Sequence, residues 1–297
     1  MNLQQSLKGL GVALITPFLP DKSIDFEALK RLVNNQIESG TDFLVVLGTT
    51  AETPTLSLTE REQVRRFIVE VNAGRLPLVA GCGGNSTAAV IEELGATDFS
   101  GFSAILSVAP YYNKPSQEGL YQHFKAVAET SPLPVILYNV PGRTGVNMKP
   151  DTTLRLAHDC PNIIGIKEAS GITGQAGTIL RGKSDDFMLW SGDDILTLPW
   201  VALGADGIIS VAGNAFPAEM SALVSNALDG DVKKAAAIHH SLAEFMGLLF
   251  ADGNPAGIKC ALAVLGRCAD VLRLPLTPVS EPTRLKMTEA INKLNKR

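Results

Sequence analysis

Cysteine and histidine are scarce in this chain, and neither is spaced as in a metal site. The 297 residues include four cysteines and four histidines. Among the cysteines only Cys260 and Cys268 lie near each other, and among the histidines only His239 and His240 are adjacent. A disulfide framework or a zinc site needs closer and more regular spacing of these residues. We therefore expect reduced thiols, no metal and a cytoplasmic protein.

The chain also lacks a long apolar run and a strong excess of charge. No stretch approaches the ~18 consecutive apolar residues of a membrane-spanning helix, and the N-terminus carries no small-residue cleavage site of a secretory signal. A formal net charge of -4 argues against nucleic acid or a membrane surface as a partner. With 45% hydrophobic and 19% charged residues, the composition is that of a globular protein with a substantial core.

Eight short apolar runs alternate with amphipathic stretches in the first part of the chain. Runs this short, continuous in apolar residues and bounded by turn formers, are typical of strands buried on both faces. Between them, residues such as Phe26, Leu29 and Val33 repeat at helical spacing. The expected strands lie at 11–18, 43–50, 77–83, 103–112, 134–141, 163–170, 187–194 and 207–214.

A closed barrel of parallel strands accounts for this alternation. Eight strand-helix units within ~215 residues fit the (β/α)8 TIM barrel, an α/β fold. The alternative, an open doubly wound sheet, usually carries a glycine-rich turn after its first strand, whereas this first strand ends in Thr16-Pro17. We therefore predict a barrel carrying the active site at residues 1–230. A C-terminal helical region at 231–297 would follow it, with helices at 231–250, 255–266 and 281–295.

A lysine interrupts one of the expected buried strands. In IIGIKEAS (163–170), Lys167 directly follows a strongly apolar run. Burying a charged amine is costly unless the amine is paired or loses its proton, and a neutral lysine amine is a nucleophile. Lys167 is therefore either a Schiff-base residue or a strand-end lysine that reaches solvent or pairs with Glu168.

Hydroxyl side chains and an arginine accompany this lysine at other strand ends, where TIM barrels carry their active sites. Hydroxyls in series can relay protons for imine chemistry without adding fixed charge, and an arginine can bind a substrate carboxylate through two hydrogen bonds. Taken singly, the threonines could cap a helix, the tyrosines could be packing aromatics and the arginine could be solvated. Their joint placement favours catalysis. The residues are Thr49, Thr50, Tyr112, Tyr138 and Arg143.

Several longer motifs carry a resemblance to a known family. The chain resembles the dihydrodipicolinate synthases, and the resemblance runs from about Gly9 to Pro278 with every motif in order. This family belongs to the pyruvate-dependent Schiff-base lyases, which also include N-acetylneuraminate lyase and sugar-acid aldolases. The matching motifs are GTTAET (48–53), PYYNKPSQEGLYQHF (110–124), YNVPGRTG (138–145) and IIGIKEAS (163–170), followed by SGDD (191–194) and GIISVAGN (207–214).

The resemblance implies catalytic roles for four matching residues and a substrate-binding role for a fifth. Lys167 would form the Schiff base with pyruvate, and Thr50 would bind the pyruvate carboxylate. Tyr138, Thr49 and Tyr112 would form a proton relay, with Tyr112 reaching in from a neighbouring subunit. The chain would therefore need a second copy of itself to complete each site.

The same resemblance implies the second substrate and the assembly. Arg143 would bind the carboxylate of L-aspartate 4-semialdehyde, and the backbones of Gly192 and Ile209 would line the pocket. The pyruvate enamine would attack the aldehyde, and transimination by the semialdehyde amino group would release Lys167. The reaction belongs to lysine and diaminopimelate biosynthesis and uses no cofactor. Such enzymes are usually homotetramers built as dimers of dimers.

Arg143 separates this family from its relatives. The neuraminate lyases resemble the chain at Lys167 and Tyr138, but they generally lack an arginine at this position and favour a serine-threonine pair at Thr49-Thr50. A pyruvate-dependent aldolase or lyase acting on N-acetylneuraminate or another 2-keto sugar acid is the alternative function. A catalytically silent barrel that serves as a binding protein is a third hypothesis, which the complete residue set disfavours.

The family's lysine feedback site is matched only in part. Asn85 and Tyr111 fit the pattern of lysine-sensitive members, whereas Leu58 stands in place of a histidine and Ala89 in place of a glutamate. Without the glutamate, the ammonium group of lysine loses its charge partner. We therefore predict weak or absent inhibition by lysine.

Overall fold

Eight parallel strands form a closed barrel in which neighbours in sequence are neighbours in space. A computed structural model describes residues 3–296 of the chain. The barrel closes where the first strand pairs with the last, with Leu10 opposite Ile208. The strands are β1 (Gly9–Ala13), β2 (Phe43–Val46), β3 (Leu78–Gly81), β4 (Ala104–Val108), β5 (Val135–Asn139), β6 (Ile163–Glu168), β7 (Met188–Ser191) and β8 (Gly207–Ser210).

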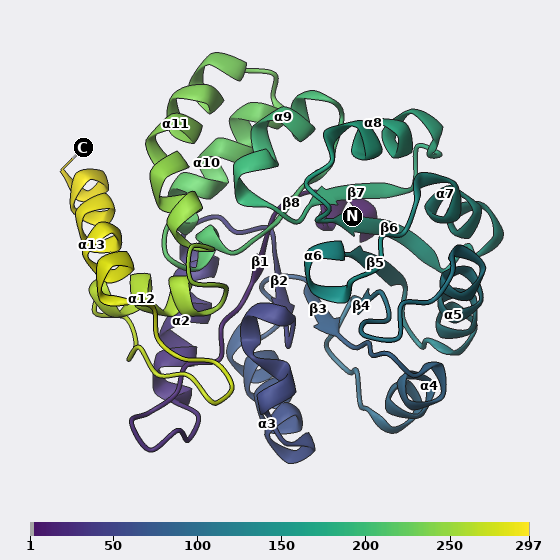
Figure 1. Cartoon of the computed structure of the whole chain (residues 1–297), viewed down its shortest axis with the longest axis horizontal. Helices are drawn as coiled ribbons and strands as arrows, with labels where there is room; N and C mark the ends of the chain where they lie inside the picture. The colour runs from purple at the N-terminus through teal and green to yellow at the C-terminus, as the bar shows by residue number, and fades with distance from the viewer. Residues whose placement is uncertain (1–2, 297) are drawn as a thin grey trace.

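Helices connect the strands and surround the barrel (Figure 1). The α-helices are α1 (Leu3–Ser6), α2 (Phe26–Glu38), α3 (Leu58–Asn72), α4 (Thr87–Ala96), α5 (Gln117–Thr130), α6 (Pro141–Thr144), α7 (Pro150–Asp159), α8 (Thr173–Gly182), α9 (Thr197–Ala202), α10 (Pro217–Leu228), α11 (Val232–Leu248), α12 (Ala256–Val264) and α13 (Glu281–Asn295). Four short 3₁₀ helices are η1 (Thr49–Ala51), η2 (Thr53–Thr55), η3 (Asp194–Leu196) and η4 (Ala212–Asn214).

All eight expected strands are present, and the TIM barrel is confirmed. The strands are shorter than the apolar runs that predicted them, and three of the runs end in 3₁₀ turns. Residues expected to finish β2, β7 and β8 instead form η1, η3 and η4. These turns lie at the C-terminal ends of the strands, and η1 carries Thr49 and Thr50, two of the residues that the sequence singled out.

Apolar side chains fill both the inside of the barrel and the layer beneath the helices. The interior cluster includes Phe43, Ile136, Trp190 and Ile209. The indole nitrogen of Trp190 donates a hydrogen bond to the carbonyl of Leu7 over 2.7 Å, which ties the N-terminal segment to the interior. Because a packed TIM-barrel interior is not a pore, the polar chemistry is confined to the strand ends.

The three helices expected in the C-terminal region are α11, α12 and α13, with bounds close to the prediction. Helix α11 packs on α10, and α13 packs on α11 and α12. In Figure 1 these helices form one side of the molecule. The expected boundary at residue 230 falls between α10 and α11, and the division into two regions stays a prediction. Within residues 3–296, no helix has both the length and the apolar character needed to cross a membrane.

Candidate active site

A cleft of about 530 Å³ opens at the C-terminal ends of β2, β3, β4 and β5. We call it the strand-end cleft. Three of the predicted site residues line it, namely Thr49, Tyr138 and Arg143. Tyr111, which the resemblance assigns to lysine binding, lines the same cleft. The fold therefore brings residues from three separate motifs to one place.

Lys167 is buried near the end of β6, with only 5% of its surface exposed. Its Nζ lies 4.5 Å from the centre of the Tyr138 ring, because these two residues are directly opposite each other on β5 and β6. A Cβ placed on Gly192 would lie 3.1 Å from Cε of Lys167, so the absence of a side chain at Gly192 leaves room for the lysine. The structure thus brings together Lys167, Tyr138 and Gly192, as the sequence predicts.

Glu168 is not the partner of Lys167, which was the alternative that the sequence left open. Its carboxylate is fully buried and accepts hydrogen bonds from Nδ2 of Asn139 at 3.0 and 3.1 Å. Nε2 of Gln175 and the backbone N–H of Ser170 donate to it over 2.9 and 2.7 Å. These four hydrogen bonds from neutral donors occupy both carboxylate oxygens, so the carboxylate is fully hydrogen-bonded without Lys167.

Thr49 and Thr50 form a 3₁₀ turn after β2, and they do not cap α3. The N-cap of α3 is Ser57, whose hydroxyl accepts from the Glu60 N–H while the Glu60 carboxylate accepts from the Ser57 N–H. Thr50 is buried, and its hydroxyl accepts a hydrogen bond from Nδ2 of Asn254 over 3.1 Å. The helix-cap reading of the two threonines is therefore wrong.

Glu52 anchors the end of this turn to the C-terminal region. It adopts a left-handed conformation with φ of 56°, and its carboxylate forms an ion pair with Lys259 of α12. Both side chains are fully buried. Burial lowers the pKa of Lys259, and the Glu52 charge opposes that effect. The second carboxylate oxygen accepts from the backbone N–H of Arg273 over 3.1 Å.

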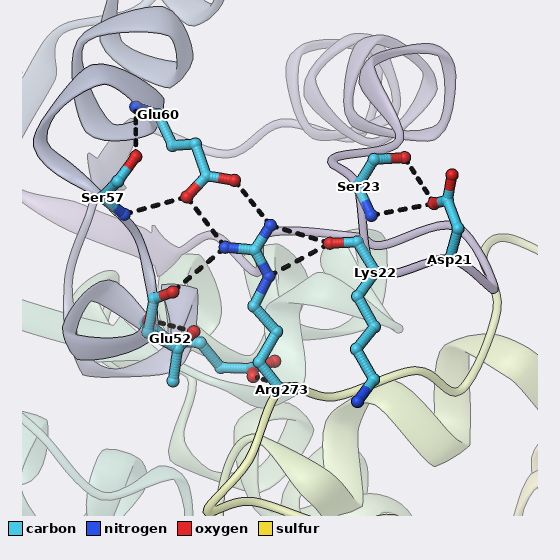
Figure 2. Close-up of polar contacts among 8 residues, drawn as sticks. Asp21, Lys22, Ser23, Glu52, Ser57, Glu60 and Arg273 are labelled. Atoms are coloured by element: carbon cyan, nitrogen blue, oxygen red, sulfur yellow. Dashed lines mark hydrogen bonds and ion pairs between the residues drawn. The ribbon is translucent and has the colours of Figure 1, made fainter.

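Arg273 ties the same C-terminal segment to α3, as Figure 2 shows. Its guanidinium donates to both carboxylate oxygens of Glu60, over 2.9 and 2.6 Å, and to the carbonyls of Lys22 and Thr55. Hydrogen bonds from Arg273 lower the pKa of Glu60 to about 2. The segment that carries Thr49, Thr50 and Glu52 is thus held by the C-terminal region on two sides.

Arg143 lies at the mouth of the strand-end cleft, on the short helix α6. Its side chain is exposed, and Nη2 donates to the backbone carbonyl of Asn254 over 3.0 Å. An exposed guanidinium with most of its donors uncommitted can bind an anion at the entrance.

Tyr112 stands apart from the strand-end cleft within one chain. It is 88% exposed and adopts φ of 74°, a left-handed conformation that is strained for a tyrosine. Its backbone N–H donates to the carbonyl of Thr144 over 3.2 Å, next to Arg143 in sequence. Tyr112 is thus exposed and strained outside the lining of the cleft, and its action in a second copy stays a prediction.

The other predicted residues lie in different surroundings. Ile209 is buried in the barrel interior with Tyr138, and the carbonyl of Asn85 accepts from Nδ2 of Asn113 over 2.9 Å. Leu58 and Ala89 line a groove of about 1010 Å³ between α3 and α4. The positions that depart from the lysine-sensitive pattern thus lie together in a groove of their own.

Sequence reasoning missed Asn254 and Lys259, which contact the Thr49–Glu52 segment from the C-terminal region. It included Asp194 in the SGDD motif but gave it no role. The buried carboxylate of Asp194 accepts from Ser210 and from the backbone N–H groups of Val211 and Ala212. Burial raises the pKa of Asp194. A carboxylate in an otherwise apolar run was a signal for Asp194, but no local pattern marked the other two.

Comparison with known proteins supports the resemblance along the whole chain. A model of the dihydrodipicolinate synthetase family matches residues 6–294. The chain is 55% identical over 292 residues to the 4-hydroxy-tetrahydrodipicolinate synthase of Phocaeicola vulgatus, and the match covers 98% of each chain.

Solved structures give the same result. Dihydrodipicolinate synthase from Aquifex aeolicus is 42% identical with a TM-score of 0.94, covering 97% of this chain and 98% of that one. A monomeric dihydrodipicolinate synthase variant is 39% identical with a TM-score of 0.95, covering 98% of each chain. The fold, the site and these matches lead to one conclusion. The chain belongs to the dihydrodipicolinate synthetase family and is an enzyme, a lyase.

Proposed function

We propose that Lys167 is the Schiff-base residue of a 4-hydroxy-tetrahydrodipicolinate synthase. The enzyme condenses pyruvate with L-aspartate 4-semialdehyde in lysine and diaminopimelate biosynthesis, the activity for which its relatives are named. The observation that carries the proposal is the buried amine of Lys167, which lies against the Tyr138 ring. A lysine amine in this position, at the end of a barrel strand, is placed to add to the ketone of a bound substrate.

The chemistry needs only the two substrates and the side chains of the site. The Lys167 amine adds to the pyruvate ketone, and loss of water gives the imine. Loss of a proton from the pyruvate methyl group gives an enamine, whose carbon attacks the semialdehyde aldehyde and converts it to a hydroxyl. The semialdehyde amino group then adds to the imine carbon, and Lys167 leaves as the amine while the ring closes. One water is released for each product formed.

Thr50 and Arg143 divide the binding of the two carboxylates. We assign the pyruvate carboxylate to Thr50, which is buried close to the end of β2, and the semialdehyde carboxylate to Arg143 at the cleft mouth. Backbone groups of Gly192 and Ile209 line the pyruvate pocket in this scheme. The free donors of the Arg143 guanidinium favour a substrate that carries a carboxylate to accept them.

Tyr138, Thr49 and Tyr112 form the proton relay in this proposal. Tyr138 and Thr49 line the strand-end cleft, whereas Tyr112 is exposed at its edge. Tyr112 therefore acts in the site of a second copy, and the working enzyme is a homo-oligomer, a tetramer of two dimers. The four cysteines are free thiols, which suits the cytoplasm where we place the enzyme.

Trapping with borohydride tests the assignment of Lys167. Pyruvate and borohydride should add one reduced pyruvyl group to wild-type protein, and peptide mass spectrometry should find it on Lys167. Lys167→Ala should take up none, while Lys286→Ala, which removes an exposed lysine of α13, should be modified like the wild type. Modification of a different lysine in the wild type would rule the assignment out.

The choice of second substrate needs a separate assay. Turnover within the usual enzyme range of ~1–1000 per second with pyruvate and aspartate semialdehyde is expected. Release of pyruvate from N-acetylneuraminate should not be detected. Activity with the sialic acid alone would assign the chain to the lyases and would mean that Arg143 has another role.

A further inference from the structure

A loop between α11 and α12 reaches the strand-end residues from the C-terminal region. Its residue Asn254 is 6% exposed, and it makes two contacts with groups that the proposed function uses. Nδ2 of its side chain donates to the Thr50 hydroxyl over 3.1 Å, and its backbone carbonyl accepts from Nη2 of Arg143 over 3.0 Å. One residue therefore contacts both of the groups assigned to substrate carboxylates.

The side-chain contact decides what the Thr50 hydroxyl can do. A hydroxyl has one proton to donate and two lone pairs. Because the Asn254 amide donates to the oxygen of Thr50, a lone pair is occupied and the proton stays free. That proton can then be donated to a carboxylate, which is the interaction that pyruvate binding requires.

An asparagine at position 254 would be energetically unfavourable if it served only for packing. Its Oδ1 is buried without a hydrogen-bond partner among residues 3–296, and buried polar atoms in native proteins nearly always have one. An apolar side chain of similar size would avoid this cost. The contact with Thr50 is the interaction that the amide side chain adds.

The turn that carries Thr50 does not depend on Asn254 for its position. Glu52 at the end of the turn is held by Lys259 and by the backbone N–H of Arg273. The Glu52 and Arg273 anchors are visible in Figure 2. Removing the Asn254 amide should therefore free the Thr50 hydroxyl to rotate while leaving the backbone of the turn in place.

We propose that Asn254 is a positioning residue that orients the Thr50 hydroxyl toward the pyruvate carboxylate, while its backbone carbonyl holds the Arg143 guanidinium at the cleft mouth. This inference rests on the proposed function. Asn254 contacts Thr50 through its side chain and Arg143 through its backbone carbonyl. A side-chain substitution should therefore weaken the binding of pyruvate and leave the binding of the semialdehyde unchanged.

The experiment compares Asn254→Ala and Asn254→Asp with wild type and with Asn226→Ala. Asn226 donates to a carbonyl of its own helix, α10, and so provides a matched loss of an amide elsewhere. Half-saturation by pyruvate is read from borohydride trapping of Lys167 without the second substrate. KM for the semialdehyde is then measured at saturating pyruvate, and Tm reports the fold.

Asn254→Ala should raise the half-saturating pyruvate concentration about fivefold, the usual scale of one hydrogen bond. Asn254→Asp should raise it more than about twentyfold, because a carboxylate would accept the Thr50 proton and repel the substrate anion. Both variants should keep the semialdehyde KM within about twofold of wild type, and Asn226→Ala should match wild type throughout.

Unchanged pyruvate saturation in both variants would overturn the proposal. Equal increases for both substrates together with a lower Tm would also overturn it, since that result describes a structural role. If Asn254→Ala does not fold, the nearly isosteric Asn254→Asp decides the question. If the wild type forms no pyruvate adduct, the proposed function itself is wrong. This result differs from those above, so failure of the proposed function can be distinguished from failure of the Asn254 proposal.

Discussion

Lys167 and Glu168 are neighbours on β6, and their side chains leave the strand on opposite faces. Lys167 meets Tyr138, which belongs to the barrel-interior cluster. The Glu168 carboxylate accepts hydrogen bonds from Asn139 and from Gln175 of α8. Asn139 directly follows Tyr138 on β5. The Asn139–Glu168 contact therefore links β5 and β6 one residue beyond the Tyr138–Lys167 pair. We therefore expect this contact to help keep the lysine amine and the tyrosine ring in place.

Glu168→Gln should weaken both the fold and the chemistry. The new amide nitrogen would face N–H donors of Asn139, Gln175 or Ser170 and lose their hydrogen bonds. We expect a loss of about 1–3 kcal/mol in the free energy of unfolding. Trapping of Lys167 by pyruvate and borohydride should also slow by roughly tenfold, because small misplacements of reacting groups are costly.

Glu289→Gln provides the comparison for this change, since Glu289 is an exposed residue of α13. It should resemble wild type in urea unfolding and in trapping rate. A normal trapping rate in Glu168→Gln would show that the β5–β6 contact has no bearing on Lys167.

At the scale of elements, the N-terminus of α3 combines a helix cap with a tertiary ion pair. The Ser57–Glu60 capping box satisfies two backbone N–H groups, and Arg273 adds two hydrogen bonds to the same carboxylate. The Glu60 carboxylate therefore both caps α3 and attaches it to the C-terminal segment. Figure 2 shows Glu60 between the two.

Glu60 makes the stability of this junction depend on pH. Its pKa is about 2 in the folded chain against an ordinary value of 4.5. A lowered folded-state pKa contributes stability above the unfolded value and loses it as the pH falls toward the folded value. Glu60→Gln should cost about 1 kcal/mol at neutral pH. The difference from wild type should shrink between pH 4.5 and pH 2.

Urea unfolding at several pH values measures this difference. Glu62→Gln is the control, because Glu62 forms only an exposed pair with Arg66 on the same helix. A gap between wild type and Glu60→Gln that stays constant across the pH range would contradict the assigned pKa.

The Glu52–Lys259 pair joins another element, α12, to the Thr49–Glu52 turn. Breaking a buried pair leaves an uncompensated charge, so Lys259→Met should destabilise the fold by about 3–5 kcal/mol. Adding Glu52→Gln removes that charge and should restore much of the loss. Thermal or urea unfolding of the single and double variants tests this, and an equally unstable double variant would argue against the charge as the cause.

At the scale of the whole molecule, our proposal that Tyr112 acts in the site of a second copy predicts that one chain does not complete its own site. In an isologous dimer each subunit can supply the tyrosine of the other. Tyr112→Phe and Lys167→Ala should each lose at least ~99% of activity when alone. Hybrids of the two would contain one site with both native residues.

Co-expression of the two variants measures this complementation. Random pairing should restore about a quarter of wild-type activity, since half the dimers are hybrids with one intact site of two. Tyr121→Phe combined with Lys167→Ala is the control: the Tyr121 hydroxyl bonds Asp159 of its own chain, so Tyr121→Phe should be active alone and the mixture should give about half of wild-type activity, with no gain from hybrids. No gain over the separate variants would place Tyr112 outside a shared site.

Inhibition by lysine is predicted to be weak or absent. Leu58 and Ala89 line the groove between α3 and α4 and offer no carboxylate to a lysine ammonium group. We expect activity to persist at sub-millimolar lysine in a steady-state assay. Half-inhibition in that range would show that another residue, such as Glu92 or Glu93 of the same groove, supplies the charge partner.

The amino-acid sequence by itself determined the barrel and most of the candidate site. Buried strands and amphipathic helices arise from residues close together in the chain, so their periodicity is readable without a fold. In a TIM barrel the ends of the strands meet at one face. Residues such as Thr49, Tyr138 and Lys167 could therefore be placed together from their positions alone, and the structure brings them together.

Only the tertiary structure decided which distant residues hold that site in place. Asn254 meets Thr50 across 204 positions of sequence, and Lys259 meets Glu52 where the C-terminal region packs back on the barrel. Glu168 could have paired with Lys167, but it faces the helices and binds amides instead. Such contacts leave no periodic pattern in the sequence, because they depend on how the closed barrel and the helices around it pack in three dimensions.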